Sequence, residues 1–149
     1  MSLKEQLTSA MKEAMKAKQP ERLGTVRMII SAIKNKEIEK RGELDDAAVI
    51  DVLSSFVKQR REAADVYRKN ARPDMAEAEE RELAIAQEFL PAQLSEDEVR
   101  ALVDEVMTEL AAESMKDMGR VMKVLTDKTK GRADGKVVSD LVRARLMAS

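Results

Sequence analysis

The sequence predicts an all-α protein with about seven helices in two lobes. Strong helix formers dominate its 149 residues, apolar residues recur at helical spacing, and no segment shows sustained strand alternation. The strongest break is Pro91, which disfavours helix at the residue before it and precedes a new helix-start signal. We therefore expect a four-helix N-terminal lobe over residues 1–91 and a three-helix C-terminal lobe over residues 92–149.

The N-terminal lobe begins with three amphipathic helices. They are expected over about residues 2–18, 20–40 and 46–70. Pro20 suits the first turn of the second helix, and Gly42 is expected to end it. Asp45 or Asp46 is expected to cap the third. The apolar face expected for the third helix consists of Val49, Val52, Phe56, Ala63 and Tyr67.

The fourth helix, expected over about residues 75–89, is acidic. The carboxylates in and beside it are Asp74, Glu77, Glu79, Glu80, Glu82 and Glu88. Paired carboxylates can serve acid–base chemistry or bind a divalent ion. Here they are spread around the helix, and Glu77 with Arg81 has the spacing of an ordinary i,i+4 ion pair. We interpret this helix as a solvated surface.

The first helix of the C-terminal lobe is expected to start at Ser95, which forms a capping-box pattern with Glu98. Two further amphipathic helices are expected on either side of the turn from Gly131 to Gly135. The apolar positions of the first of them are Met118, Val121, Met122, Leu125 and Thr129. Gly131 suits the left-handed residue that ends a helix, and Asp134 suits the N-cap of the next.

The basic residues of this helical hairpin are the candidate nucleic-acid contacts. They are Arg120, Lys123, Lys128, Lys130, Arg132, Lys136 and Arg143. We expect the turn bounded by Gly131 and Gly135 to face phosphate, because amides exposed at a helix start attract anions. The alternative is a solvated charged face without a ligand, which is common on helices.

The charge distribution separates the two ends of the chain from its middle. The net charge of −1 combines +5 over residues 1–73, −11 over residues 74–113 and +5 over residues 114–149. Aromatic residues make up 2% of the chain, which leaves few platforms on which unpaired bases could stack. The composition therefore argues against a typical single-strand binder.

Several classes of site are excluded by composition. Without cysteine there are no disulfides or thiolate ligands, and without histidine the commonest general base and zinc ligand is missing. We expect no cofactor and no metal. No apolar run is long enough to span a membrane, and the N-terminus lacks the pattern of a secretory signal. A cytoplasmic protein is the expectation.

Four stretches together resemble a known family over nearly the whole chain. They are RMIISAIKNKEIE from Arg27, QRREAADVYRKNARPDMAEAEERELAIAQEFLPAQLSEDEV from Gln59, MGRVMKVL from Met118 and GRADGKVVSDLVRARL from Gly131. The last is similar to the tail domain of the B subunit of tRNA-dependent Asp/Glu amidotransferases. The set resembles the small free-standing bacterial proteins of the GatB/YqeY family.

The resemblance implies two helical lobes, and a role for the second lobe in translation. In the amidotransferase the tail contacts the outer corner of tRNA, and the amide-transfer chemistry belongs to other domains. The leading hypothesis is therefore an accessory module that binds tRNA or structured RNA without chemistry of its own. The alternatives are an adaptor for a translation or tRNA-charging enzyme and, with less support, a carbon–nitrogen ligase that uses glutamine as amide donor.

Overall fold

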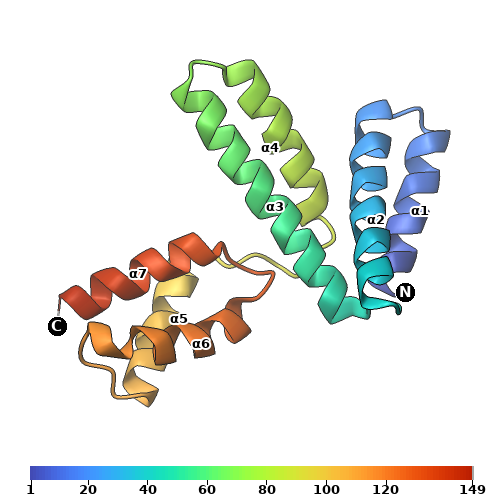
Figure 1. The fold of residues 1–149 in the computed structure, drawn as a ribbon. Helices are drawn as coiled ribbons and strands as arrows, with labels where there is room; N and C mark the ends of the chain where they lie inside the picture. Colours follow the sequence, from blue (N-terminus) through green and yellow to red (C-terminus); the bar gives the residue numbers. More distant parts are fainter. Residues whose placement is uncertain (149) are drawn as a thin grey trace. The chain divides into compact units, whose positions relative to one another are not determined.

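The computed structural model describes residues 1–148, which contain seven α-helices, one short 3₁₀ helix and no strand (Figure 1). The predicted all-α class and the number of helices are confirmed. Contacts divide the chain into two compact units, Met1–Leu90 and Pro91–Ser149. That the chain divides into an N-terminal lobe of residues 1–91 and a C-terminal lobe of residues 92–149 stays a prediction.

The first unit consists of two helical hairpins (Figure 1). Its helices are α1 (Leu3–Lys16), α2 (Pro20–Lys40), α3 (Asp46–Lys69) and α4 (Pro73–Gln87). Helix α1 packs along α2 and α3 along α4, while α2 also contacts both α3 and α4. Fully buried aliphatic side chains fill the space between the hairpins, among them Leu7, Val26, Ile29, Val49 and Leu53.

Local signals set the ends of these helices. Pro20 and Pro73 occupy first turns, and Asp45 caps α3 by accepting a hydrogen bond from the Ala48 amide at 2.9 Å. The expectation that Gly42 ends α2 is wrong by one residue. Arg41 takes the left-handed conformation, with φ 60°.

The expected apolar face of α3 is only partly correct. Val49 and Phe56 are buried as expected, but Val52, Ala63 and Tyr67 are half-buried. The remaining buried positions are Leu53, Val57 and Ala64. The buried arc is shifted because α3 lies against α4 along its length and also against α2. Helical spacing in the sequence does not reveal that second contact.

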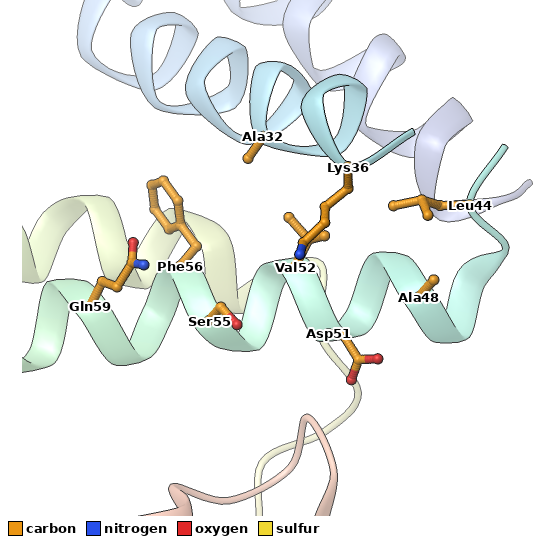
Figure 2. Close-up of a pocket in the computed structure, with 9 residues that line it drawn as sticks. All are labelled: Ala32, Lys36, Leu44, Ala48, Asp51, Val52, Ser55, Phe56 and Gln59. Carbon is orange, nitrogen blue, oxygen red and sulfur yellow. The ribbon is translucent and has the colours of Figure 1, made fainter. Parts of the chain in front are cut away.

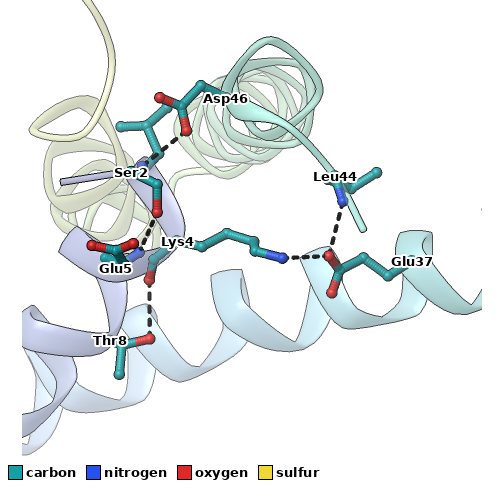
Figure 3. Close-up of polar contacts among 8 residues, drawn as sticks. Ser2, Lys4, Glu5, Thr8, Glu37, Leu44 and Asp46 are labelled. Carbon is teal, nitrogen blue, oxygen red and sulfur yellow. Dashed lines mark hydrogen bonds and ion pairs between the residues drawn. The ribbon is translucent and has the colours of Figure 1, made fainter. Parts of the chain in front are cut away.

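A carboxylate at the end of α2 connects three elements of the first unit (Figure 3). Glu37 accepts hydrogen bonds from Lys4 Nζ at 2.7 Å and from the Leu44 amide at 2.9 Å. The bond with Lys4 is the main reason that the pKa of Glu37 is lowered and that of Lys4 raised. The start of α1 and the loop before α3 are thereby fixed to the end of α2.

The acids in and beside α4 form the expected solvated surface only in part: Asp74, Glu77, Glu80 and Glu88 are exposed, whereas Glu79 and Glu82 are half-buried. Arg60 of α3 lies 3.2 Å from Glu82 and 3.9 Å from Glu79. Arg68 of α3 holds both carboxylate oxygens of Glu80, at 2.7 and 2.8 Å. These ion pairs form because α3 and α4 lie side by side and carry opposite charges on facing positions.

The proposed pair within α4 is also replaced by contacts between helices. Arg81 Nε pairs with Glu21 of α2 at 2.7 Å, rather than mainly with Glu77 one turn away. Glu88 pairs with Arg22 of α2 at 2.6 Å. A carboxylate on a neighbouring helix thus competes successfully with the local i,i+4 partner.

The second unit consists of three α-helices and a 3₁₀ turn. They are α5 (Glu96–Glu109), η1 (Met115–Asp117), α6 (Met118–Thr129) and α7 (Gly135–Met147). The predicted capping box is present, because Ser95 Oγ accepts from the Glu98 amide at 3.1 Å and Glu98 accepts from the Ser95 amide at 3.0 Å. The core contains Val99, Val106, Val121, Leu125 and Val142.

Candidate nucleic-acid interface

Helices α6 and α7 form a hairpin with a buried inner face. Val121 and Leu125 of α6 are fully buried, and Val138 and Val142 bury the matching face of α7. Thr129 is also buried, and its Oγ1 donates to the Leu125 carbonyl at 2.7 Å. Charged residues occupy the outer positions, so the predicted amphipathic pattern is confirmed.

The turn between the helices uses the two residues that the sequence indicated. Gly131 has φ 72°, which glycine adopts without steric cost. The Arg132 amide donates to the Thr129 carbonyl at 2.8 Å, which closes the end of α6. Asp134 caps α7 by accepting from the Lys136 amide at 3.1 Å.

The same turn holds the segment that leads into α5. The Leu94 amide donates to the Arg132 carbonyl at 2.8 Å, and Gln93 Nε2 donates to the Gly131 carbonyl at 2.7 Å. Arg132 Nε donates to the Ala92 carbonyl at 3.2 Å. Arg132 therefore has a structural role through both its backbone and its side chain.

Two further candidate cations are paired within their own helix region. Arg120 Nη2 lies 2.7 Å from Asp117, which also accepts hydrogen bonds from the Glu113 and Ser114 amides. These bonds, above all the one from Glu113, lower the pKa of Asp117 to about 2. Arg143 lies within 3.9 Å of Asp140.

The lysines among the candidates are exposed. Within the described part of the chain, no carboxylate or carbonyl pairs with the side chains of Lys123, Lys128 and Lys136. Lys130 is exposed too, and it interacts with another group of the chain. Lys123, Lys128 and Lys136 are thus the candidates that could exchange water for a phosphate without losing an internal contact.

Six of the seven candidates form a cluster at the turn or lie at the far end of the hairpin, and Lys123 lies between the two groups on α6. Lys128, Lys130, Arg132 and Lys136 lie within nine residues of chain around the turn. Arg120 precedes this cluster by about 12 Å along α6, and Arg143 follows it by about 10 Å along α7, at about 1.5 Å per helical residue. Since α7 returns beside α6 (Figure 1), both arginines lie away from the turn.

The turn itself is less open to an anion than the glycines suggested. Gly131 is buried and Gly135 is exposed. The Asp134 carboxylate already lies at the first turn of α7, where it accepts a hydrogen bond from the Lys136 amide. A second anion there would meet this negative charge, so the lysine side chains are the better phosphate contacts. A phosphate-facing role for Gly131 and Gly135 stays a prediction.

Two contacts that shape the site were not predicted. Asp117 closes a capping box with Ser114 before α6, and Arg145 of α7 pairs with Asp104 of α5 at 3.0 Å. The spacing of Ser114 and Asp117 could have indicated the first. The second joins residues 41 positions apart, which no local pattern reveals.

The described residues contain no group of three or more acidic side chains placed to hold a metal ion. None of the helices described is long and apolar enough to cross a membrane.

Comparison with known proteins gives the family. The sequence profile of the YqeY-like proteins matches residues 4–146, which is almost the entire chain. This chain belongs to the YqeY-like family. Its predicted family is therefore confirmed.

Yeast proteins are among the relatives of this YqeY-like chain. The proteins named altered inheritance of mitochondria protein 41, mitochondrial, are 41% identical over 108 residues in Lachancea thermotolerans and 37% identical over 107 residues in Eremothecium gossypii. Their counterpart in Kluyveromyces lactis is 36% identical over 108 residues. Each match covers 70% of this chain, but only 57% or 58% of the relative.

The relatives correct one expectation. We expected a bacterial, cytoplasmic protein, and this is wrong, because the matched proteins are eukaryotic and their names place them in mitochondria. The expectation followed from the absence of cysteine and from the resemblance to bacterial proteins. Neither observation carries information about the compartment in which the relatives work.

Proposed function

We propose that the α6–α7 hairpin of this YqeY-like protein binds tRNA or another structured RNA through backbone phosphates. The observation that carries the proposal is the exposure of Lys123, Lys128 and Lys136 on the outer face of the hairpin, where no group among residues 1–148 pairs with their side chains. Residues 114–149 have a net charge of +5. Double-stranded RNA is recognised largely by shape and phosphate contacts, so the shortage of aromatic residues is no obstacle.

The neighbouring acidic residues limit the size of the RNA footprint. Within the second unit, residues 91–113 carry a net charge of −6 and include the whole of α5. A phosphate backbone that extended over α5 would be repelled. Contact is therefore restricted to the lysine-bearing side of α6 and α7, and the affinity expected from so few phosphate contacts is modest.

The number of contacts gives a quantitative expectation. Each phosphate neutralised by a lysine contributes about 0.7 to 0.9 to the slope of log affinity against log salt concentration. Three such contacts give a slope of about −2 to −3. An increase from 50 to 200 mM salt should then weaken binding by roughly 20- to 40-fold.

The experiment compares purified wild-type protein with a variant in which Lys123, Lys128 and Lys136 are changed to glutamate. Arg132 is left intact because its side chain holds the Ala92 carbonyl, and a change there would also disturb the fold. Binding to bulk tRNA is measured by fluorescence anisotropy over a salt series. We expect salt-dependent binding by the wild type and its loss in the variant.

The matched control makes the same change of charge in the first unit. The exposed residues Lys12, Lys16 and Lys58 are changed to glutamate, which leaves the hairpin untouched but gives the same net charge. This control should bind nearly as well as wild type. No wild-type binding at 50 mM salt, or equal losses in both variants, would refute a phosphate-binding face on the hairpin.

An adaptor role through the acidic helix is less well supported. Glu79, Glu80 and Glu82 are already engaged by arginines of α3, so they are poor candidates for meeting a partner. The ligase alternative is tested by ATP- and glutamine-dependent conversion of Glu-tRNA by the purified protein, for which we expect no product. The chain spans less than two thirds of its yeast relatives, and any activity of a longer protein is a separate question.

A further inference from the structure

The guanidinium of Arg60 has one donor that meets only a weak acceptor. Its Nε donates to Glu82 at 3.2 Å, and its Nη1 donates to the side-chain oxygen of Gln59 at 3.4 Å. Nη2 instead meets the sulfur of Met28 on α2 at 3.8 Å, and it has no oxygen partner within residues 1–148. A thioether sulfur is a weak acceptor. The contact between α3 and α2 at this point is therefore a strong donor opposite a poor acceptor.

The surroundings hold the guanidinium in place and leave the methionine accessible. The guanidinium carbon of Arg60 lies 3.8 Å from the centre of the Phe56 ring, and this ring projects from α3 toward α2 (Figure 2). Phe56 and Gln59 line one end of a groove of about 450 Å³ between the two helices, and Ala32 of α2 lines it from the other side. Met28 precedes Ala32 by one helical turn and is 39% exposed. A small solute can therefore reach its side chain.

Oxidation of the sulfur would supply the missing acceptor. In the reaction with hydrogen peroxide, the sulfur attacks one peroxide oxygen with a lone pair, the S–O bond forms and the O–O bond breaks. The departing hydroxide takes the remaining peroxide proton and leaves as water, so the sulfur is oxidised by two electrons and the peroxide is reduced. The product is a sulfoxide, whose oxygen is a far better acceptor than the thioether sulfur. Bonded to Nη2 of Arg60, it forms a charge-assisted hydrogen bond between α2 and α3.

This environment separates Met28 from the other exposed methionines. No group among residues 1–148 donates a hydrogen bond to the sulfur of any of them. They are Met1, Met15, Met75, Met115 and Met147. Methionine oxidation commonly disrupts packing, because a polar and chiral group replaces a flexible apolar chain. Beside Arg60 the effect on stability should have the opposite sign.

We propose that Met28 is a redox modification site, at which hydrogen peroxide forms a sulfoxide that accepts a hydrogen bond from Arg60 and holds α2 against α3. Oxidation at this site makes the first unit more resistant to unfolding. Methionine sulfoxide reductases convert the product back to methionine, so the change is reversible. The proposal does not depend on RNA binding by the α6–α7 hairpin.

The test measures how mild treatment with hydrogen peroxide changes the melting temperature of the purified full-length protein. Peptide mapping by mass spectrometry identifies the methionines that have gained an oxygen. Met28→Leu removes the sulfur at the proposed site, and Met15→Leu is the matched control at a methionine that is 50% exposed. The shift on oxidation should be more positive in wild type than in Met28→Leu by about 2 to 5 °C, for one added hydrogen bond in a unit of this size. Met15→Leu should behave like wild type.

A third variant tests the donor. Arg60→Leu keeps an apolar side chain over Phe56 but removes Nη2, so oxidation of Met28 should then lower the melting temperature. Treatment of the oxidised wild type with methionine sulfoxide reductase should restore the original value. The proposal is wrong if Met28 stays reduced while Met15 is oxidised, or if oxidation shifts wild type and Met28→Leu equally. It is also wrong if the gain persists in Arg60→Leu; should that variant not fold, the comparison with Met28→Leu still decides.

Discussion

Arg60 is predicted to be the most important charged residue for the stability of the first unit. Its guanidinium carbon lies 3.8 Å from the centre of the Phe56 ring, and its Nε lies 3.2 Å from Glu82 of α4. Nη2 also lies 3.8 Å from the sulfur of Met28 in α2. One side chain thus connects α2, α3 and α4, and only 21% of it is exposed.

The magnitude follows from these contacts. A partly desolvated cation–π contact contributes about 1 kcal/mol, and an ion pair of this exposure adds roughly 0.5 to 1 kcal/mol. Packing of the aliphatic stem against Phe56 contributes about 0.8 kcal/mol for each buried methylene. We therefore expect Arg60→Ala to lower the free energy of unfolding by about 2 to 3 kcal/mol. Arg60→Lys keeps the charge and most of the stem, and should cost about 1 kcal/mol.

The assay is urea unfolding followed by circular dichroism, with a double-mutant cycle that combines Arg60→Lys and Phe56→Leu. If the planar guanidinium and the ring interact as described, the two changes should couple by about 1 kcal/mol. Arg68→Ala is the matched control, because Arg68 of α3 also pairs with an acid of α4, Glu80, but its side chain is 47% exposed. A cost below about 0.5 kcal/mol for Arg60→Ala, or no coupling with Phe56, would refute this reasoning.

Three further predictions concern single contacts. Hydrogen bonds lower the pKa of Asp117 from 3.8 to about 2. The ionised carboxylate therefore stabilises the folded protein above pH 4, and this stabilisation is lost as the pH falls toward 2. Asp117→Asn should remove this acid-dependent loss of stability, as measured by thermal unfolding. Glu37→Gln should lower the melting temperature at pH 7, since the lowered pKa of Glu37 and the raised pKa of Lys4 both stabilise the folded state there. The effect should fade in acid, as Glu37 becomes protonated, and in strong alkali, as Lys4 loses its proton. Asp140→Asn releases Arg143 and should make the salt dependence of RNA binding steeper by up to about 0.9 in slope; an unchanged slope would mean that Arg143 lies outside the footprint.

The sequence predicted features that depend on local interactions. The Ser95 capping box, the Asp134 cap and the left-handed Gly131 each involve residues within a few positions of one another. The same holds for the helix periods, because burial on one side imposes a repeat of three or four residues. Such features are encoded within one turn of helix and require no knowledge of the partner helix.

Contacts between helices were not predictable in this way. Arg81 has a nearby acid in Glu77 but pairs with Glu21, 60 residues away in sequence. The buried face of α3 is shifted for a similar reason, since α2 packs against it as well as α4. Spacing within one helix indicates which residues share a face, but it does not indicate which other helix packs against that face.

The candidate interface illustrates the difference between counting charges and finding available charges. Arg120 and Arg143 each have an aspartate three residues earlier, and both pair with it. These two ion pairs could therefore have been predicted from the sequence. Arg132 is different, because its partner is the Ala92 carbonyl, 40 residues away. The rigid guanidinium, with five donors, suits such fixed partners, whereas the flexible lysine ammonium remains hydrated and exchangeable. The three arginines therefore stabilise the hairpin, and the proposed contacts with RNA belong to the lysines.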